Sequence, residues 1–218
     1  MNITFEWATY PRLLERDFFL WTKELYELEQ YLKTPIPDSM HWTRRFEYPW
    51  ILSKLYRDTA LPNTKRSFID VGAGATALQF LISSQASWSV DSIDPDTAAI
   101  AWVNSHKREH PHSILGGFPT LPFKDNEYDV GICISVLEHL PKAQVLPSIQ
   151  ELLRVSRKEV LITMDVCLQT HPVQTDLGDF DRLRSALGVM MIMPGPNTMA
   201  FHIDGYDFNV ACLHIVKG

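Results

Sequence analysis

The stretch SFIDVGAGATALQFLI, residues 67–82, constrains the fold of this chain most strongly. It starts as a short apolar run that ends at Asp70, passes through Gly72 and Gly74, and then takes the apolar spacing of a helix that begins near Thr76. Glycines allow a ligand to approach the backbone closely, and a helix N-terminus presents unpaired N–H groups. The stretch therefore predicts a strand, a tight turn and a helix that together cradle a nucleotide-like ligand.

A second acid follows at the distance that such a cradle requires. Residues 88–93 are predicted to form the next strand, and that strand ends at Asp94. In a strand–helix–strand unit, a carboxylate about 20 residues beyond the glycine turn reaches the hydroxyls of a bound ribose. Asp94 is therefore the candidate ribose-binding residue.

The glycines alone leave the ligand open, because Gly72-Ala-Gly74-Ala-Thr-Ala77 also fits the G-x-G-x-x-G/A pattern of dinucleotide enzymes. Asp70 separates the two interpretations. Its carboxylate would repel a pyrophosphate at the helix N-terminus but attract a ligand that carries an ammonium group. S-adenosylmethionine has such a group, so Asp70 favours a methyl donor, and an NAD(P)-dependent oxidoreductase is the alternative.

Beyond the turn, two further segments strengthen the first interpretation. GGFPTLPFKDNEYDVGICISVLEHLP, residues 116–141, and ELLRVSRKEVLITMD, residues 151–165, follow the turn in order. With it, they resemble the class I S-adenosylmethionine-dependent methyltransferases, in particular the small-molecule branch with LPF and EHL motifs. The resemblance implies a doubly wound, Rossmann-like α/β fold with a seven-stranded sheet, and a reaction that converts S-adenosylmethionine to S-adenosylhomocysteine.

The resemblance also implies where the donor binds. Asp70, Gly72 and Gly74 would surround its methionine part. Asp94, with Pro95 after it, would contact the ribose.

The adenine end of the site departs from the family pattern. By resemblance, Gly117 and Phe118 would lie beside the adenine, and Ser135 would close the far side of the pocket. Gly117 stands where the family often has an acid, and Thr76 where it often has a third glycine. Threonine is expected to cap the helix that starts there. Because Gly117 lacks the acid of the family, the second alternative is a non-catalytic relative that still binds S-adenosylmethionine.

Composition fits one sizeable globular domain. The chain has 218 residues, of which 45% are hydrophobic and 21% charged. We expect an N-terminal helical cap over residues 1–62 and the methyltransferase domain over residues 63–218. Because 26 acidic residues outnumber 20 basic ones, the net charge is −6, and a nucleic-acid partner is not expected.

The cysteines and the apolar runs bear on cellular location. Cys133, Cys167 and Cys212 lie in apolar surroundings without metal-ligand spacing, as reduced core thiols do, and no metal site is expected. No apolar run approaches the roughly 20 residues of a membrane span, and the N-terminus lacks the order of a signal peptide. We therefore expect a cytoplasmic protein with no membrane partner. A homodimer is left open.

The N-terminal region is the expected source of the acceptor site. It is rich in aromatic residues, and residues 11–33 have the apolar spacing of a helix. By resemblance, such additions commonly shape the acceptor site. Arg44 or Arg45 is a candidate to hold an acidic acceptor, and Tyr48 a candidate to reach the donor carboxylate.

The candidate general bases follow the central strands. Residues 128–134 predict a strand buried on both faces that ends at Ser135, and residues 160–164 predict its neighbour. Their carboxyl ends should border the site. If the acceptor is a hydroxyl of a small metabolite, a histidine there is the natural base. The candidates are His139 and then His171, and the methylated atom is expected to be oxygen or nitrogen.

Overall fold

The computed structural model describes residues 1–35, 41, 43–56, 64–85, 87–106, 110–188, 198 and 200–218. Its strands are β1 (Asn2–Trp7), β2 (Arg66–Val71), β3 (Trp88–Asp94), β4 (His112–Leu115), β5 (Tyr128–Ile134), β6 (Ser156–Cys167), β7 (Ala200–Ile203) and β8 (Tyr206–Val216). Its helices are α1 (Tyr10–Leu13), α2 (Arg16–Leu32), α3 (Arg44–Leu55), α4 (Leu78–Ser83), α5 (Thr97–Ser105), the 3-10 helix η1 (Leu137–His139), α6 (Lys142–Val155) and α7 (Leu177–Leu187).

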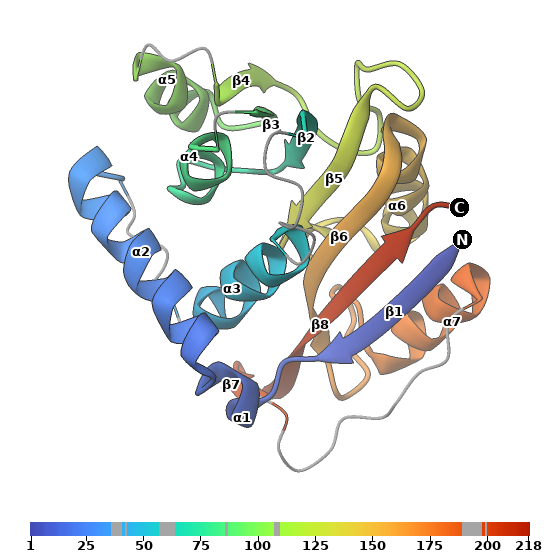
Figure 1. Cartoon of the computed structure of the whole chain (residues 1–218). Helices are drawn as coiled ribbons and strands as arrows, with labels where there is room; N and C mark the ends of the chain where they lie inside the picture. The colour runs from blue at the N-terminus through green and yellow to red at the C-terminus, as the bar shows by residue number, and fades with distance from the viewer. Residues whose placement is uncertain are drawn as a thin grey trace.

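All the described strands belong to one sheet, in the order β1-β8-β6-β5-β2-β3-β4, and β7 pairs with β8 outside this path (Figure 1). Strands β4, β3, β2, β5 and β6 are parallel to their neighbours, whereas β8 is antiparallel to both β6 and β1. The order reverses direction at β2, as in doubly wound folds, where ligands bind beyond the carboxyl ends of the strands. The predicted fold class is confirmed, with β7 as an eighth strand.

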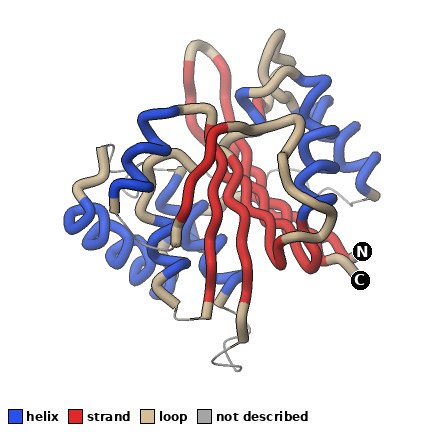
Figure 2. Tube along the Cα trace, turned by 90° about the horizontal axis from the view of Figure 1, so that it is seen from above, coloured by secondary structure: helices blue, strands red, loops and turns tan. Residues whose placement is uncertain are grey.

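Helices cover both faces of the sheet, as the view in Figure 2 shows. On one face, Phe68 and Leu161 pack against helices α2 to α5. On the other face, Ile69 and Ile162, the next residues in each strand, pack against α6 and α7. Side chains alternate between the faces of a strand, so a central strand buried on both sides is apolar at successive positions. This is why the apolar residues 128–134 form β5 with the predicted bounds.

The N-terminal region differs from the expected helical cap in one respect. Residues Asn2–Trp7 form β1, which pairs antiparallel with β8 at the edge of the sheet. Ile3, Phe5 and Trp7 pack on the α6–α7 face, and alternation of this kind is typical of a strand. The helical prediction for the first 62 residues therefore missed a strand.

Helix α3 links the N-terminal region to the parallel strands. Phe46, Trp50, Leu52 and Leu55 are fully buried against the sheet and α2. Burial of a side chain of this size contributes about 1.5–3 kcal/mol, so α3 is firmly held. Among the described residues, no helix combines the length and apolar character needed to cross a bilayer.

Candidate active site

A cavity of about 150 Å³ lies where the carboxyl ends of β2 and β5 meet the first turns of α3. The strand order of the parallel part of the sheet reverses here, between β2 and β5. Its walls are formed by Arg44, Tyr48, Asp70, Gly72, Ala73, Gly74, Thr76, Leu78, Ile134 and Ser135. The structure therefore brings together four predicted site residues at the ends of β2 and β5 and in the turn between β2 and α4 with two from α3.

The glycine turn has the backbone that this cavity needs. Gly72 has a φ of +74° and Gly74 a φ of +59°, and L side chains rarely adopt these values. A Cβ on Gly72 would lie 2.4 Å from Cγ2 of Val136, whereas a Cβ on Gly74 would meet nothing closer than 3.8 Å. Gly72 is therefore needed for packing, and Gly74 keeps the cavity wall open.

Asp94 is buried and fixes the turn from the end of β3. Its Oδ2 accepts a hydrogen bond of 2.8 Å from the Gly74 N–H, and its Oδ1 accepts one of 2.8 Å from the Asp96 N–H. A second cavity, of about 260 Å³, shares Gly74 and Thr76 with the first and has Asp94 in its wall. The predicted ribose residue thus borders a space that adjoins the turn.

The expected capping role of Thr76 is wrong. Helix α4 begins at Leu78, its N-cap position is Ala77, and no side chain caps it. Thr76 lines both cavities instead.

The predicted adenine residues lie beside Asp94. A Cβ on Gly117 would be 3.9 Å from Cδ of Pro95, so these two residues nearly touch across the ends of β4 and β3. Phe118 is half-buried and packs against the core on the α6–α7 face. In the sheet β4 lies beyond β3 as seen from β2, so Pro95, Gly117 and Phe118 lie at the ends of β3 and β4, away from Asp70 on β2.

Asp70 has an unusual electrostatic environment. Burial at the end of β2 and the charge of Asp94 together raise the pKa of its carboxyl to about 7, although the charge of Arg44 lowers it. A cationic group in the cavity would favour the ionised form. The carboxyl is therefore poised to bind a cation and to release its proton as it does so.

Glu47 connects α3 to the ends of two strands. It is fully buried. Its Oε1 accepts hydrogen bonds from Ser135 Oγ at 2.7 Å and from Thr163 Oγ1 at 2.6 Å, and its Oε2 pairs with the Arg44 guanidinium. The positive φ of Ser135, 49°, turns that residue toward this network at the end of β5.

The same network changes the expected role of the arginines. Arg44 lines the cavity, but its guanidinium pairs with Glu47 and donates a 2.5 Å hydrogen bond to Ser135 Oγ. It also lies 5.8 Å from the centre of the Tyr48 ring. These partners fix the position of the Arg44 guanidinium and compensate part of its charge. Arg45 is exposed on α3 and does not line either cavity.

The two candidate bases differ from the expectation. His139 ends the 3-10 helix η1 after β5 and is exposed, whereas its neighbour Glu138 is buried. Burial raises the pKa of Glu138 well above its usual range, and the charge of Asp165 adds to this effect. In the EHL motif the acid, and not the histidine, turns inward.

His171 supports a loop. Its Nδ1 accepts hydrogen bonds from the backbone N–H groups of Val173 and Gln174, at 3.2 and 2.9 Å. This arrangement leaves the proton of a neutral ring on Nε2, and the ring packs edge-on against Tyr206 at 4.5 Å. Such a ring has no free nitrogen lone pair with which to act as a base.

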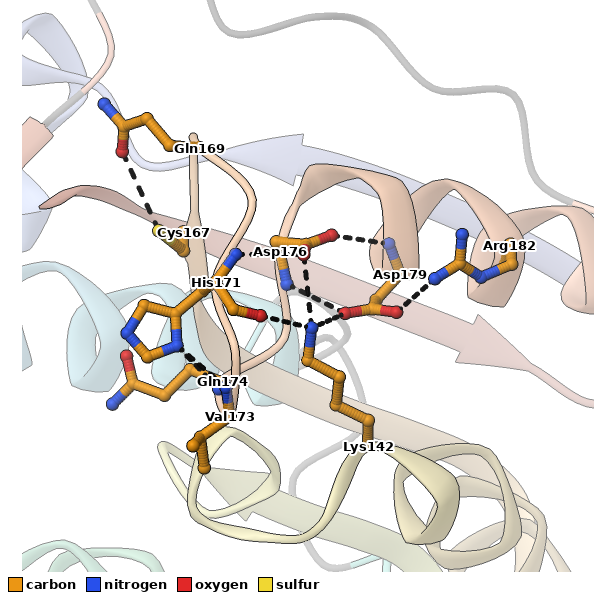
Figure 3. A network of polar contacts seen from close by, with 9 residues as sticks. All are labelled: Lys142, Cys167, Gln169, His171, Val173, Gln174, Asp176, Asp179 and Arg182. Carbon is orange, nitrogen blue, oxygen red and sulfur yellow. Dashed lines mark hydrogen bonds and ion pairs between the residues drawn. The ribbon is translucent and has the colours of Figure 1, made fainter.

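A lysine holds this loop in place from α6 (Figure 3). Lys142 Nζ donates to the His171 carbonyl at 2.7 Å and forms ion pairs with Asp176 at 3.2 Å and Asp179 at 2.5 Å. Asp179 also pairs with Arg182 on α7. The network joins the β6–α7 loop to the helices that flank it, and this gives His171 a structural setting.

Replacing His171 with alanine should therefore lower stability more than donor binding. Loss of two accepted hydrogen bonds predicts a decrease of about 1–2 kcal/mol in the free energy of unfolding, which thermal denaturation measures. S-adenosylhomocysteine affinity should stay unchanged. His139→Ala is the matched control, and its effect on stability should stay within about 0.5 kcal/mol. Loss of methyl transfer in His139→Ala alone would support His139 as the base.

Three acids of the site were not among the candidate site residues: Glu47, and also Glu138 and Asp165, which were expected only at the border of the site. Each had a sequence signal. Glu47 is a lone acid in the apolar run FEYPWIL, and Asp165 follows a buried strand directly. Glu138 belongs to the EHL motif, in which His139 was chosen as the candidate base instead.

The sheet order, the glycine turn and the acids at the ends of β2 and β3 define a doubly wound protein with a nucleotide-type site. Residues 69–164 match a family described as methyltransferase domain. No curated protein sequence matches the chain. Residues 69–164 are therefore assigned to a methyltransferase domain, and the chain is an enzyme that uses S-adenosylmethionine.

Solved structures show the same fold. Magnesium protoporphyrin IX methyltransferase of Synechocystis PCC 6803 with bound S-adenosylmethionine is 16% identical, with 94% of this chain and 98% of that chain covered and a TM-score of 0.55. The structure of the same enzyme with bound S-adenosylhomocysteine is 17% identical, with 93% of this chain and 98% of that chain covered and a TM-score of 0.56. The YcgJ protein of Bacillus subtilis is 13% identical, with 75% and 97% covered and a TM-score of 0.54. Among the described residues, no group of three or more acids, histidines and cysteines is arranged to hold a metal ion.

Proposed function

We propose that this protein transfers a methyl group to an oxygen or nitrogen atom of a small molecule, with the donor held in the two adjoining cavities. The observation that carries the proposal is the cavity between Asp70, the glycine turn and Ser135, which shares Gly74 with the space beside Asp94. The open wall at Gly74 fits a ligand that lies directly on the backbone. S-adenosylmethionine supplies a methyl group on a positively charged sulfur, so the donor needs no further activation.

The residues of the chain would then position and protect the donor. Asp70 faces its ammonium group, and Asp94 faces the ribose with the oxygen that also holds the Gly74 N–H. Pro95, Gly117 and Phe118 flank the adenine. A displacement at carbon requires that the protein align the two reactants and exclude water. Holding the reactants in line makes the step effectively unimolecular, and this accounts for much of the rate of methyl transfer.

The N-terminal region, residues 1–62, is proposed to contribute to the acceptor site. Support comes from α3, which places Arg44, Glu47 and Tyr48 at the carboxyl ends of β2, β5 and β6. In this role Tyr48 borders the methionine part of the donor, and Arg44 holds Ser135 in position.

Titration calorimetry with S-adenosylhomocysteine and with NADH tests the proposed donor site. We expect a saturable heat with the first ligand and none with the second. Methyl release from the donor in the presence of small-molecule acceptors then separates an enzyme from a relative that only binds. Binding of NADH alone, or an unchanged S-adenosylhomocysteine affinity in Asp94→Ala, would contradict the proposed site.

Donor binding should depend on pH. The pKa of Asp70 is about 7 because of burial, so the carboxyl is mostly protonated at pH 6 and mostly ionised at pH 7.5. An ammonium prefers the ionised form, so S-adenosylhomocysteine affinity should increase roughly tenfold between these pH values, with proton release. Calorimetry in buffers of different ionisation enthalpy measures both quantities. A pH-independent affinity would contradict the contact with Asp70.

A further inference from the structure

Two buried carboxyl groups beside the donor cavity are not used by the donor site. Glu138 lies on η1, just after β5, and Asp165 lies near the end of β6. Among the described residues, neither Oε1 nor Oε2 of Glu138 has a hydrogen-bond partner, and the same is true of Asp165 Oδ1. Buried oxygen atoms without partners cost about 1–3 kcal/mol each, and a ligand that donates hydrogen bonds to them would remove this cost.

These oxygens belong to the same part of the molecule as the donor cavity. Asp165 is close enough to Glu47 and Arg44 for both charges to act on it, and Arg44 lines the cavity. Glu138, Asp70 and Glu47 all act on the buried thiol of Cys133 in β5. The acids therefore lie around the ends of β2, β5 and β6.

The balance of charge there selects against an acidic ligand. Four carboxyl groups, those of Glu47, Asp70, Glu138 and Asp165, gather around Arg44, which is already paired with Glu47. Burial and the neighbouring acids raise the pKa of Asp70, Glu138 and Asp165, so a further carboxylate would be unfavourable there, whereas a cation would favour their ionised forms. An ammonium group also has three N–H donors, which match the three oxygens that lack partners, and an alcohol has one donor.

We propose that Glu138 and Asp165 bind the methyl-accepting group and that this group is an amine. The inference rests on the proposed function and names its acceptor class. Asp165 is half-buried, but the three oxygens without partners are buried, so an amine can pair with them only if the side chains that cover them move.

The pair would also remove the proton that blocks the reaction. A protonated amine has no lone pair, so one N–H proton must move to a carboxylate oxygen of the pair before the nitrogen can form the new N–C bond. The bond between the methyl carbon and sulfur breaks, and its electrons stay on sulfur. The methylated nitrogen is again positively charged, and the remaining negative charge of the pair stabilises it.

Binding of benzylamine, benzyl alcohol and benzoate to the S-adenosylhomocysteine complex tests the inference by calorimetry. We expect benzylamine to bind at least tenfold more tightly than benzyl alcohol, and benzoate to bind most weakly. In Glu138→Gln and Asp165→Asn the amine preference should be lost, with S-adenosylhomocysteine affinity unchanged within twofold. Glu159→Gln, which alters a half-buried acid paired with His214 and Arg66 away from the cavities, is the control and should keep the preference.

A second readout does not depend on catalysis. Infrared difference spectra should show that benzylamine removes a protonated-carboxyl band in the native protein but not in Glu138→Gln. Equal affinities for the three head groups, or no measurable binding of benzylamine, would overturn the inference alone. Absence of S-adenosylhomocysteine binding in the native protein would instead defeat the proposed function on which it rests.

Discussion

Asp70→Asn should weaken S-adenosylhomocysteine binding by about 10- to 100-fold and at the same time stabilise the free protein above pH 7. A hydrogen bond between an ammonium and a carboxylate contributes about 1.5–3 kcal/mol, and asparagine keeps the shape of the side chain without its charge. The loss should appear in calorimetry as a higher Kd at pH 7.5. The pH dependence of binding should disappear with it.

The gain in stability follows from the direction of the pKa shift. Burial raises the pKa of Asp70 to about 7 in the folded protein, well above the 3.8 of an ordinary aspartate. A raised carboxyl pKa means that ionisation opposes folding, and the cost develops between about pH 4 and pH 7 and is fully present above pH 7. Asparagine cannot ionise, so the variant should be more stable at pH 8 by on the order of 2–4 kcal/mol.

Asp129→Asn is the matched control, since Asp129 is a buried aspartate at the opposite end of the parallel strands. Salt bridges with Arg157 and Lys158 oppose the effect of burial and lower its pKa to about 2. That acid stabilises the folded state above pH 4, so its loss should destabilise the protein and leave donor affinity unchanged. Native-like donor affinity in Asp70→Asn would remove Asp70 from the site.

Glu47→Ala should cause the largest loss of stability among these variants, about 3 kcal/mol or more. The change removes the buried partner of Arg44 and leaves the hydroxyls of Ser135 and Thr163 without an acceptor. Breaking a buried ion pair from one side costs about 3–5 kcal/mol. For a chain of this size the melting temperature should fall by roughly 6–12 °C, measured by calorimetry.

Two comparisons isolate the network from the helix itself. Glu47→Gln keeps an oxygen that can accept from both hydroxyls and should lose less stability than Glu47→Ala. Glu24→Ala, at an exposed position of α2, should change stability by no more than about 0.5 kcal/mol. If Glu47→Ala melts within 2 °C of the native protein, the docking of α3 does not depend on this carboxylate.

Local sequence patterns predicted the centre of the molecule well. The bounds of β5 matched because a strand buried on both faces is apolar at successive positions and has turn residues at its ends. The glycine turn and Asp94 were found for a similar reason, since the φ values of Gly72 and Gly74 are a property of the turn itself.

Features that depend on distant partners were not predicted. The pairing of β1 requires β8, and the hydrogen bond between Thr4 and the carbonyl of His214 spans 210 residues. The pairing of Glu47 requires that α3 docks on the ends of β5 and β6. Apolar runs also predict strands at residues 189–193, which lie outside the described residues, and at residues 210–216, which lie within β8.

The position of β8 has a consequence for how the chain is assembled during translation. This strand is inserted between β6 and β1, so Asn2–Trp7 can take its native place only after a segment about 200 residues later has been synthesised. The glycine turn, by contrast, depends on strands that are close together in the sequence. The half of the sheet that holds the donor cavity can thus form on the ribosome before residues 2–7 have a strand to pair with. In a nascent chain stalled before residue 206, residues 2–7 should therefore be accessible to a protease.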